Sequence, residues 1–297
     1  MAGIAVPISL ASAGDVDSAL ALGVRAAGGG ADLIEWRVDR LASEDAGPAA
    51  VERLVREGAL PAIVTCRAAD EGGAFTGTEG ERVGLLDHLL VAGAIPAYVD
   101  VEYGRWIASS DLADATSGLR VKGTKIILSA HDFSGRPEKL DDIFLRIDEA
   151  PGSDVTKVAW RAESVLDSLE CAARLQQRRR ETIVLCMGEP GLLTRVFAGL
   201  WGGLLTFAAL EAGQGSAPGQ PTLKELRETY RIAEIDGDTE LHPIFGDASE
   251  ARAANAALRR EGRNAVALPL GKLPMHQQSA IREALANSPF VRLTATG

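Results

Sequence analysis

An imidazole and an amine stand one strand–helix–strand unit apart in this sequence. His131 and Lys157 each lie at or near the end of a short apolar segment. Because neighbouring parallel strands run about 4.8 Å apart, this spacing can place the two side chains next to each other. Lys157 is the more unusual residue, since the chain has six lysines against 25 arginines. A neutral amine can act as a nucleophile, whereas a guanidinium cannot.

The elements that must position these side chains can be read from the hydrophobic pattern. Eight short apolar runs rich in β-branched residues lie at about 4–10, 32–38, 61–66, 97–102, 124–129, 155–160, 182–187 and 203–207. Amphipathic segments at helical spacing separate them, such as Leu140, Ile143, Phe144 and Ile147. The alternation predicts an α/β fold, a (β/α)8 TIM barrel, with a doubly wound sheet as the alternative.

Composition excludes several classes of protein. The 297 residues are 46% hydrophobic and carry a formal net charge of −10, which disfavours nucleic acid as a partner. The longest stretch of low polarity, 198–210, is shorter than the roughly 18 residues that span a bilayer. The start of the chain lacks the basic segment of a secretory signal. Three cysteines without metal-ligand spacing are interpreted as buried reduced thiols. We therefore expect a cytoplasmic protein that binds neither membrane nor nucleic acid.

Ionisable residues gather where the predicted strands end. Glu35 and Arg37 alternate along the second strand, so both point to the same face. The ends of the next four strands or their loops add the following groups: Arg67 with Glu71, Asp100 with Glu102, His131, and Lys157. In a barrel the active site lies at the C-terminal ends of the strands. Five consecutive strands are therefore predicted to deliver ionisable groups to one rim.

Two glycine-rich loops follow the seventh and eighth strands. Neither loop matches a nucleotide-binding fingerprint. The second loop carries Ser216 and Gln220, and we interpret it as a lid whose hydroxyl and amide bind an oxygen-rich ligand. Arg195 is placed to hold a carboxylate through two parallel hydrogen bonds.

Residues 4–231 resemble the type I 3-dehydroquinate dehydratase family. The motifs that carry the resemblance are Glu35-Trp36-Arg37-Val38-Asp39, Thr65-Cys66-Arg67, Glu71-Gly72-Gly73, Tyr98-Val99-Asp100-Val101-Glu102, Ser129-Ala130-His131-Asp132-Phe133, Lys157-Val158-Ala159, Thr194-Arg195 and Ser216-Ala217-Pro218-Gly219-Gln220. One departure is Thr194, where the family usually has serine, but the hydroxyl is retained.

The resemblance implies a role for each matched residue. Lys157 would form a Schiff base with the substrate ketone, His131 would transfer protons, and Glu71 would orient the histidine. Arg195 would bind the substrate carboxylate. The residues that would contact hydroxyls or line the pocket are Ser9, Glu35, Arg37, Arg67, Ser216 and Gln220.

The implied reaction is the elimination of water from 3-dehydroquinate to give 3-dehydroshikimate, in the shikimate pathway of aromatic amino acid biosynthesis. A protonated imine draws the charge of the developing carbanion into a neutral enamine, so neither a metal nor an organic cofactor is needed. The four histidines show no metal-ligand spacing, which agrees with this expectation. The family also implies a homodimer.

Two other interpretations remain open. Another Schiff-base barrel, such as a class I aldolase, would also use a lysine on the sixth strand. A barrel without catalytic activity could instead bind a metabolite of the same pathway, although a protein that only binds has no use for an imine-forming amine.

Residues 234–297 follow the predicted barrel of residues 1–233. Strand-like and helical segments alternate at about 241–245, 249–261, 265–270, 276–287 and 291–294, which predicts a small β-α-β-α-β unit. Residues 244–247, 255–257 and 264–270 weakly resemble the start of shikimate dehydrogenase. The serine-containing substrate stretch is shortened and a glycine-rich NADP loop is missing. We therefore expect a non-catalytic remnant that serves packing, dimerisation or regulation.

Overall fold

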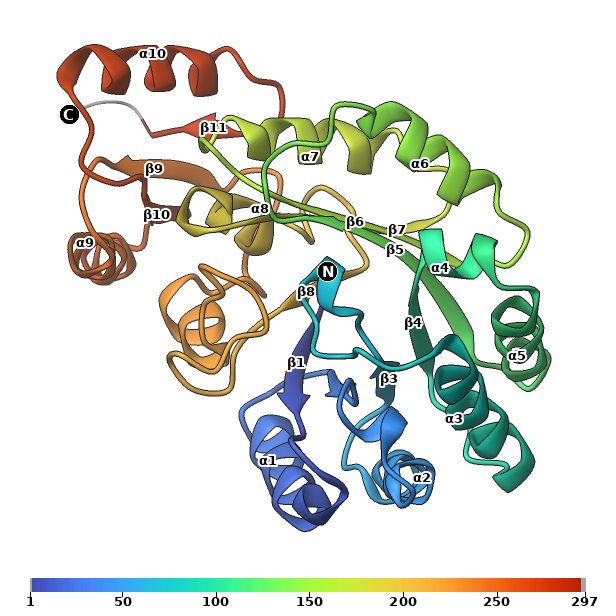
Figure 1. Ribbon diagram of the computed structural model, residues 1–297. Helices are drawn as coiled ribbons and strands as arrows, with labels where there is room; N and C mark the ends of the chain where they lie inside the picture. Colours follow the sequence, from blue (N-terminus) through green and yellow to red (C-terminus); the bar gives the residue numbers. More distant parts are fainter. Residues whose placement is uncertain (1, 295–297) are drawn as a thin grey trace.

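The computed structural model describes residues 2–294, which form a barrel and a smaller unit beside it (Figure 1). The eight barrel strands are β1 (Gly3–Ser9), β2 (Leu33–Arg37), β3 (Ala62–Thr65), β4 (Tyr98–Glu102), β5 (Lys125–Asp132), β6 (Val155–Arg161), β7 (Glu181–Met187) and β8 (Leu205–Phe207). All eight predicted strands are therefore present close to their expected positions.

The strands run parallel in the order β7-β6-β5-β4-β3-β2-β1-β8. Strands β1 to β7 pair with their neighbours in the sequence. Strand β8 pairs with β1, as a closing barrel requires. The Leu204 N–H donates to the Thr182 carbonyl at 2.9 Å and links the start of β8 to β7. The predicted (β/α)8 barrel is confirmed, and the doubly wound alternative is wrong.

Helices lie outside the barrel strands, and most of them bury one face against the strands. They are α1 (Val16–Gly28), α2 (Gly47–Glu57), α3 (Glu79–Ala92), α4 (Tyr103–Ala108), α5 (Ser110–Val121), α6 (Leu140–Glu149), α7 (Asp167–Gln176) and α8 (Leu192–Val196), with a π-helical turn at Glu225–Thr229. Helix α3 begins with a capping box between Thr78 and Glu81 and ends at Gly93, which has φ 67°. No helix within residues 2–294 is long and apolar enough to cross a membrane.

The side chains inside the barrel change from apolar to polar along the strands. Near the N-terminal ends, the buried interior cluster includes Ala5, Leu33, Ile63, Ile127, Val155 and Ile183. Two residues further along, on the same face, four of these strands carry Glu35, Thr65, Ser129 and Lys157. The apolar layer closes the floor of the barrel, and the polar layer above it faces the C-terminal rim.

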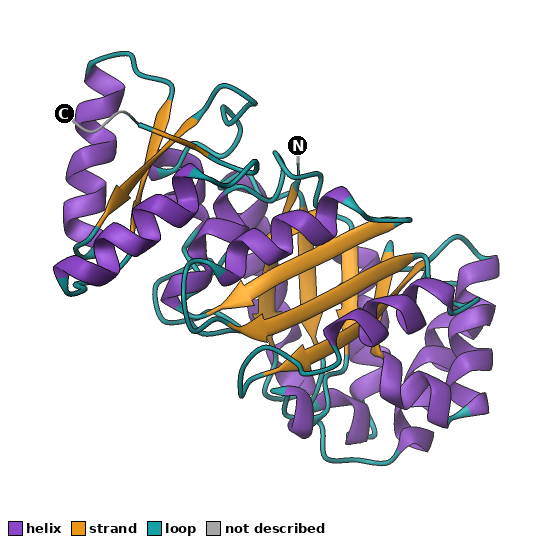
Figure 2. Cartoon of the chain, turned by 90° about the horizontal axis from the view of Figure 1, so that it is seen from above, coloured by secondary structure: helices purple, strands orange, loops and turns teal. Residues whose placement is uncertain are grey.

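The smaller unit has a three-stranded parallel sheet, β10-β9-β11, with two helices. Its elements are β9 (Glu240–Ile244), α9 (Ala248–Arg260), β10 (Ala265–Pro269), α10 (Met275–Ala286) and β11 (Arg292–Leu293), as the sequence pattern predicts. Figure 2 shows this unit beside the barrel at one end of the molecule. Its core residues Leu241, Val266 and Leu285 belong to the same hydrophobic cluster as Trp201 and Leu226 of the barrel segment.

Candidate active site

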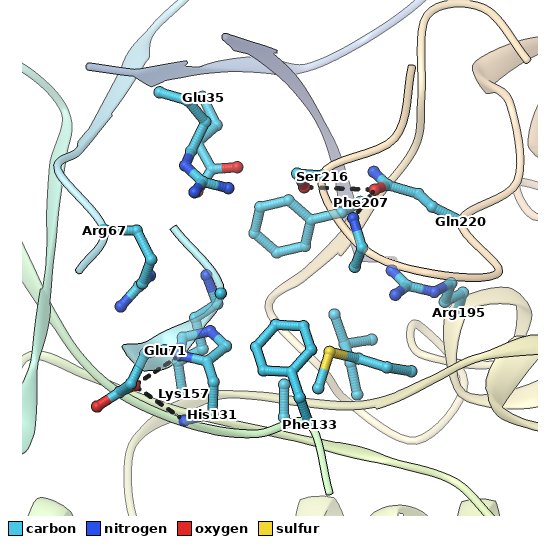
Figure 3. A pocket seen from close by; sticks show the side chains of 16 residues that line it. Glu35, Arg67, Glu71, His131, Phe133, Lys157, Arg195, Phe207, Ser216 and Gln220 are labelled. Carbon is cyan, nitrogen blue, oxygen red and sulfur yellow. Dashed lines mark hydrogen bonds and ion pairs between the residues drawn. The ribbon is translucent and has the colours of Figure 1, made fainter. Parts of the chain in front are cut away.

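A pocket at the C-terminal ends of the strands brings together nine of the ten predicted site residues (Figure 3). They are Glu35, Arg37, Arg67, Glu71, His131, Lys157, Arg195, Ser216 and Gln220. The tenth, Ser9, is exposed at the end of β1, beside Arg37 in register, and is not among the residues that line the pocket. Aromatic side chains from Phe133 and Phe207 complete the walls.

Lys157 lies on β6 and is 6% exposed. Its Nζ donates to Asp100 Oδ2 at 2.6 Å and lies 4.7 Å from the centre of the Phe207 ring. Asp100 also accepts hydrogen bonds from Arg67 at 2.7 Å and from the Ser129 hydroxyl at 2.6 Å. The amine therefore sits in a network that fixes its position between a carboxylate and an aromatic face.

Asp100 is the functional residue to which the sequence analysis assigned no role. Its alternation with Glu102 at the end of β4 placed it among the rim charges, but the pattern did not identify its partners. Burial alone would raise the pKa of Asp100, yet the cations of Arg67 and Lys157 outweigh burial and hold this pKa well below its usual range. Asp100 therefore remains a carboxylate beside the amine.

His131 lies on β5 and contacts Glu71 twice. Its Nδ1 is 3.1 Å from Glu71 Oε2, and its backbone N–H donates to the same oxygen at 3.1 Å. Burial, reinforced by the charges of Arg67 and Lys157, lowers the pKa of His131 well below its usual value. The imidazole is therefore neutral near pH 7 and can accept a proton.

Glu71 is held in place by the turn that carries it. A 3₁₀ turn spans Ala69–Glu71 and ends at Gly72, which has φ 77°. A Cβ on Gly72 would come within 2.2 Å of the Phe133 ring, so only glycine fits between the turn and this ring. Burial raises the pKa of Glu71 to about 7, against the opposing charge of Arg67.

Two further carboxylates anchor the loop from Arg67 to Phe75. Glu102, which is fully buried, accepts the Ala68 N–H at 2.7 Å and an Arg82 hydrogen bond at 2.7 Å. Asp39 accepts the N–H groups of Arg67 at 2.9 Å and Ala74 at 3.0 Å. Buried backbone donors need such partners, so the loop that places Glu71 is fixed at several points.

Arg195 occupies the opposite side of the pocket (Figure 3). It is 2% exposed, and within residues 2–294 no carboxylate lies within salt-bridge distance and Nε has no hydrogen-bond partner. Burial lowers the pKa of Arg195 to about 10. A buried cation without a partner is costly, and an anionic ligand would compensate it. Arg195 is therefore suited to bind a carboxylate.

Thr194, the departure from the family pattern, has a structural contact. Its hydroxyl accepts the Cys186 N–H at 3.1 Å and donates to the Gly191 carbonyl at 2.7 Å. These bonds tie α8 to the end of β7. Because serine has the same hydroxyl, the exchange preserves the local hydrogen bonding.

The glycine-rich segment after β8 contributes Ser216, Ala217 and Gln220 to the pocket lining. The Ser216 hydroxyl is 3.3 Å from Gln220 Oε1, while Gln220 Nε2 has no partner among the described residues. The Gly188 N–H donates to the Pro218 carbonyl at 2.9 Å. At Gly219, which has φ 68°, a Cβ would lie 2.3 Å from the Gly188 carbonyl carbon, so glycine permits this close approach.

Taken together, the pocket presents an amine, a neutral imidazole and an uncompensated guanidinium. Glu35 accepts a hydrogen bond from the Thr65 hydroxyl at 2.9 Å, and Arg37 forms an ion pair with Asp39 at 2.7 Å. The arrangement can bind an anionic, hydroxylated carbonyl compound, form an imine with it and move a proton at the adjacent carbon.

Comparisons with protein families and with individual relatives point to the same family. A family model described as type I 3-dehydroquinase matches residues 4–237. The chain is 31% identical over 226 residues to a 3-dehydroquinate dehydratase of Methanosarcina barkeri, which covers 74% of this chain and 92% of that protein. It is 34% identical over 220 residues to the bifunctional 3-dehydroquinate dehydratase/shikimate dehydrogenase of Arabidopsis thaliana, covering 73% of this chain but only 35% of that protein.

Solved structures show the same fold. The type I 3-dehydroquinate dehydratase of Clostridium difficile superposes with a TM-score of 0.65 at 26% identity, covering 78% of this chain and 92% of that one. The dehydroquinate dehydratase and shikimate dehydrogenase structure from S. pombe covers 98% of this chain and 55% of that one, with a TM-score of 0.61. At 23% identity, this second likeness concerns the fold alone.

Proposed function

Because the chain belongs to the type I 3-dehydroquinase family, we propose that it eliminates water from 3-dehydroquinate through an imine on Lys157. Family membership makes the chain a hydro-lyase of the shikimate pathway, and the product is 3-dehydroshikimate. The observation that carries the proposed mechanism is the buried Lys157, held by Asp100 in the same pocket as a neutral His131.

The first step joins Lys157 to the substrate ketone. The amine must lose a proton before it attacks, and the neutral His131 imidazole in the same pocket is suited to accept this proton. His131 then protonates the departing hydroxyl of the addition product, and water leaves to give a protonated imine. The Asp100 carboxylate, 2.6 Å from Nζ, stabilises the positive charge of this imine.

The second step removes the proton next to the imine carbon. Neutral His131 accepts this proton, while the electron pair moves into the imine and forms a neutral enamine. The histidine, now protonated beside Glu71, gives its proton to the substrate hydroxyl, which leaves as water. Hydrolysis of the new imine releases 3-dehydroshikimate and restores the amine.

Substrate binding is assigned to the opposite side of the pocket and to the rim. Arg195 would bind the carboxylate, and its lack of an internal partner supports this role. Glu35, Arg37, Arg67, Ser216 and Gln220 would contact hydroxyls, with Ser9 further out at the rim. We expect the reaction to need no metal or organic cofactor, and we propose a homodimer in the cytoplasm.

Activity on 3-dehydroquinate tests the proposal directly. Elimination places a double bond in conjugation with the ketone, so product formation can be followed by ultraviolet absorbance. We expect activity in wild type that survives a chelator and is lost in Lys157→Met. Cleavage of a carbon–carbon bond in the substrate would favour an aldolase, and binding without turnover would favour a metabolite sensor.

A further inference from the structure

The unit at residues 240–293 contacts the segment that carries Arg195. We propose that this unit positions the substrate-binding Arg195 through its contact with Trp201, and we call this arrangement the brace. The inference rests on the proposed function only for the identity of the ligand that Arg195 binds. It gives the C-terminal unit a role in the reaction of the barrel without placing any of its residues in the pocket.

One contact between the two units is a partly buried hydrogen bond. Trp201 follows α8 and is 3% exposed. Its indole Nε1 donates to the carbonyl of Phe290 at 2.9 Å, and Phe290 lies between α10 and β11 of the C-terminal unit. The indole thus spans from the barrel to a backbone group of the added unit, and Figure 1 shows α8 lying beside that unit.

Trp201 is connected to Arg195 through the chain that continues from α8. The Phe197 N–H donates to the Leu193 carbonyl at 2.9 Å, and the Trp201 N–H donates to the Phe197 carbonyl at 3.1 Å. The Phe197 side chain is fully buried, and its ring centre is 5.8 Å from that of Trp201. On the barrel side, the Thr206 hydroxyl donates to the Arg195 carbonyl at 3.0 Å. The backbone of Arg195 is therefore held between β8 and the turn that Trp201 anchors.

Arg195 depends on this backbone support more than Arg67 does. The Arg67 guanidinium is oriented by direct hydrogen bonds to Asp100 and Ser129, at 2.7 Å each. Arg195 has no acidic partner within the described residues, so packing and backbone position determine where its guanidinium points. A small movement of α8 would change the geometry of a bidentate contact with a carboxylate.

The relatives show that the barrel alone does not require such a unit. The match to the Methanosarcina barkeri protein takes up 92% of that protein and 74% of this chain, which leaves little length there for a counterpart of residues 240–293. In this chain, by contrast, the Trp201 indole donates to the added unit. The brace therefore requires a chain that extends beyond the barrel, as this one does.

The test removes the hydrogen bond and keeps the ring. In Trp201→Phe the donor to Phe290 is lost, and we expect the KM for 3-dehydroquinate to rise about three- to fivefold with kcat within about twofold of wild type. Trp106→Phe is the matched control, because it removes a comparable bond, from Trp106 Nε1 in α4 to Thr116 Oγ1 at 3.2 Å, that does not involve α8 or the C-terminal unit. The control should leave KM unchanged.

Hydrogen exchange provides a readout that does not depend on activity. Amides of residues 192–201 should exchange faster in Trp201→Phe and not in Trp106→Phe. A second variant, Ser288→Ala, approaches from the added unit, since the Ser288 hydroxyl accepts the Phe290 N–H at 3.2 Å, and it should give a smaller change of the same sign.

The outcomes separate this inference from the proposed function. Unchanged KM and unchanged exchange around α8 in both Trp201→Phe and Ser288→Ala would overturn the brace, even with a fully active wild type. An inactive wild type in which Trp201→Phe still accelerates exchange at α8 would overturn the proposed function and leave the brace standing. If Trp201→Phe does not fold, Ser288→Ala decides by the same two measurements.

Discussion

The two sides of the pocket differ in whether their buried charges have partners of opposite charge. On the side of β3 to β6, the buried cations are paired, because Arg67 and Lys157 both contact Asp100, and Glu71 is hydrogen-bonded to the neutral His131. On the side of β7 and β8, the lining contains apolar side chains, the neutral polar side chains of Ser216 and Gln220, and one cation, Arg195, without an acidic partner in the described residues. The first side can keep protonation states fixed for chemistry, whereas the second side lacks the anion that a ligand would bring.

Because of this contrast, we expect substitution of a buried arginine to change the free energy of unfolding differently on the two sides. A buried ion pair is broken at high cost, because removing one member leaves the other charge uncompensated. A lone buried cation already carries that cost in the unliganded protein.

The largest expected effect comes from removing the amine on the paired side. Lys157→Met abolishes imine formation, and we expect kcat to fall by at least about 10⁴-fold. Folding should survive, because a methionine fills a similar volume beside Phe207. Steady-state kinetics, with circular dichroism to check the fold, measures this. Retained turnover in a folded variant would contradict the covalent mechanism.

Removal of the imidazole should have the next largest effect. In His131→Ala the lysine remains, but the imidazole that moves the proton is lost, so we expect kcat to fall by about 10²- to 10⁴-fold. The variant should still form the imine slowly. Single-turnover measurements with a trapping step can separate imine formation from elimination, and a normal rate of elimination would assign the proton transfer to another group.

Two arginine substitutions should change stability in opposite directions. Arg67→Met leaves Asp100 with fewer partners and should lower the free energy of unfolding by about 3 to 5 kcal/mol. Arg195→Met removes an uncompensated buried charge and should raise it by about 1 to 3 kcal/mol, while weakening substrate binding.

Urea denaturation measures both effects, provided that the slope with denaturant is unchanged between variants. Loss of stability in both variants, by similar amounts, would show that Arg195 is compensated in the free protein. The contrast between the two sides would then be wrong.

The last predicted effect is a pH dependence on the paired side. The pKa of Glu71 is raised from 4.5 to about 7 in the folded protein, so its protonated form stabilises the fold below pH 4.5, and this contribution is lost as the pH rises to about 7. The stability of wild type relative to Glu71→Gln should therefore decrease between these values, by up to about 3 kcal/mol. Denaturation at several pH values tests this, and a flat difference would contradict the raised pKa.

Much of this architecture could be predicted from sequence because it depends on local periodicity. Apolar runs of strand length and the alternation of Glu35 with Arg37 give the strands, the face that points inward and the rim where charges gather. The small unit was predicted for the same reason, with strand and helix positions that agree with β9 to β11 and α9 to α10.

The pairing of the charges could not be predicted in the same way. Asp100 holds Lys157 from a strand two positions away in the sheet, and only the register and stagger of the barrel bring them together. Ser9 illustrates the converse, because the family resemblance assigns it to the pocket, while the structure leaves its side chain exposed and outside the lining. The contact of Trp201 with Phe290 likewise joins segments 89 residues apart without a sequence signal.

The central claim is that Lys157 binds the substrate covalently, and borohydride trapping tests it most directly. The protein is incubated with 3-dehydroquinate and sodium borohydride, and the modified peptide is identified by mass spectrometry. The account predicts loss of activity together with one reduced adduct, located on Lys157 and absent in Lys157→Met. No adduct, or an adduct elsewhere in an enzyme whose turnover survives Lys157→Met, would contradict it.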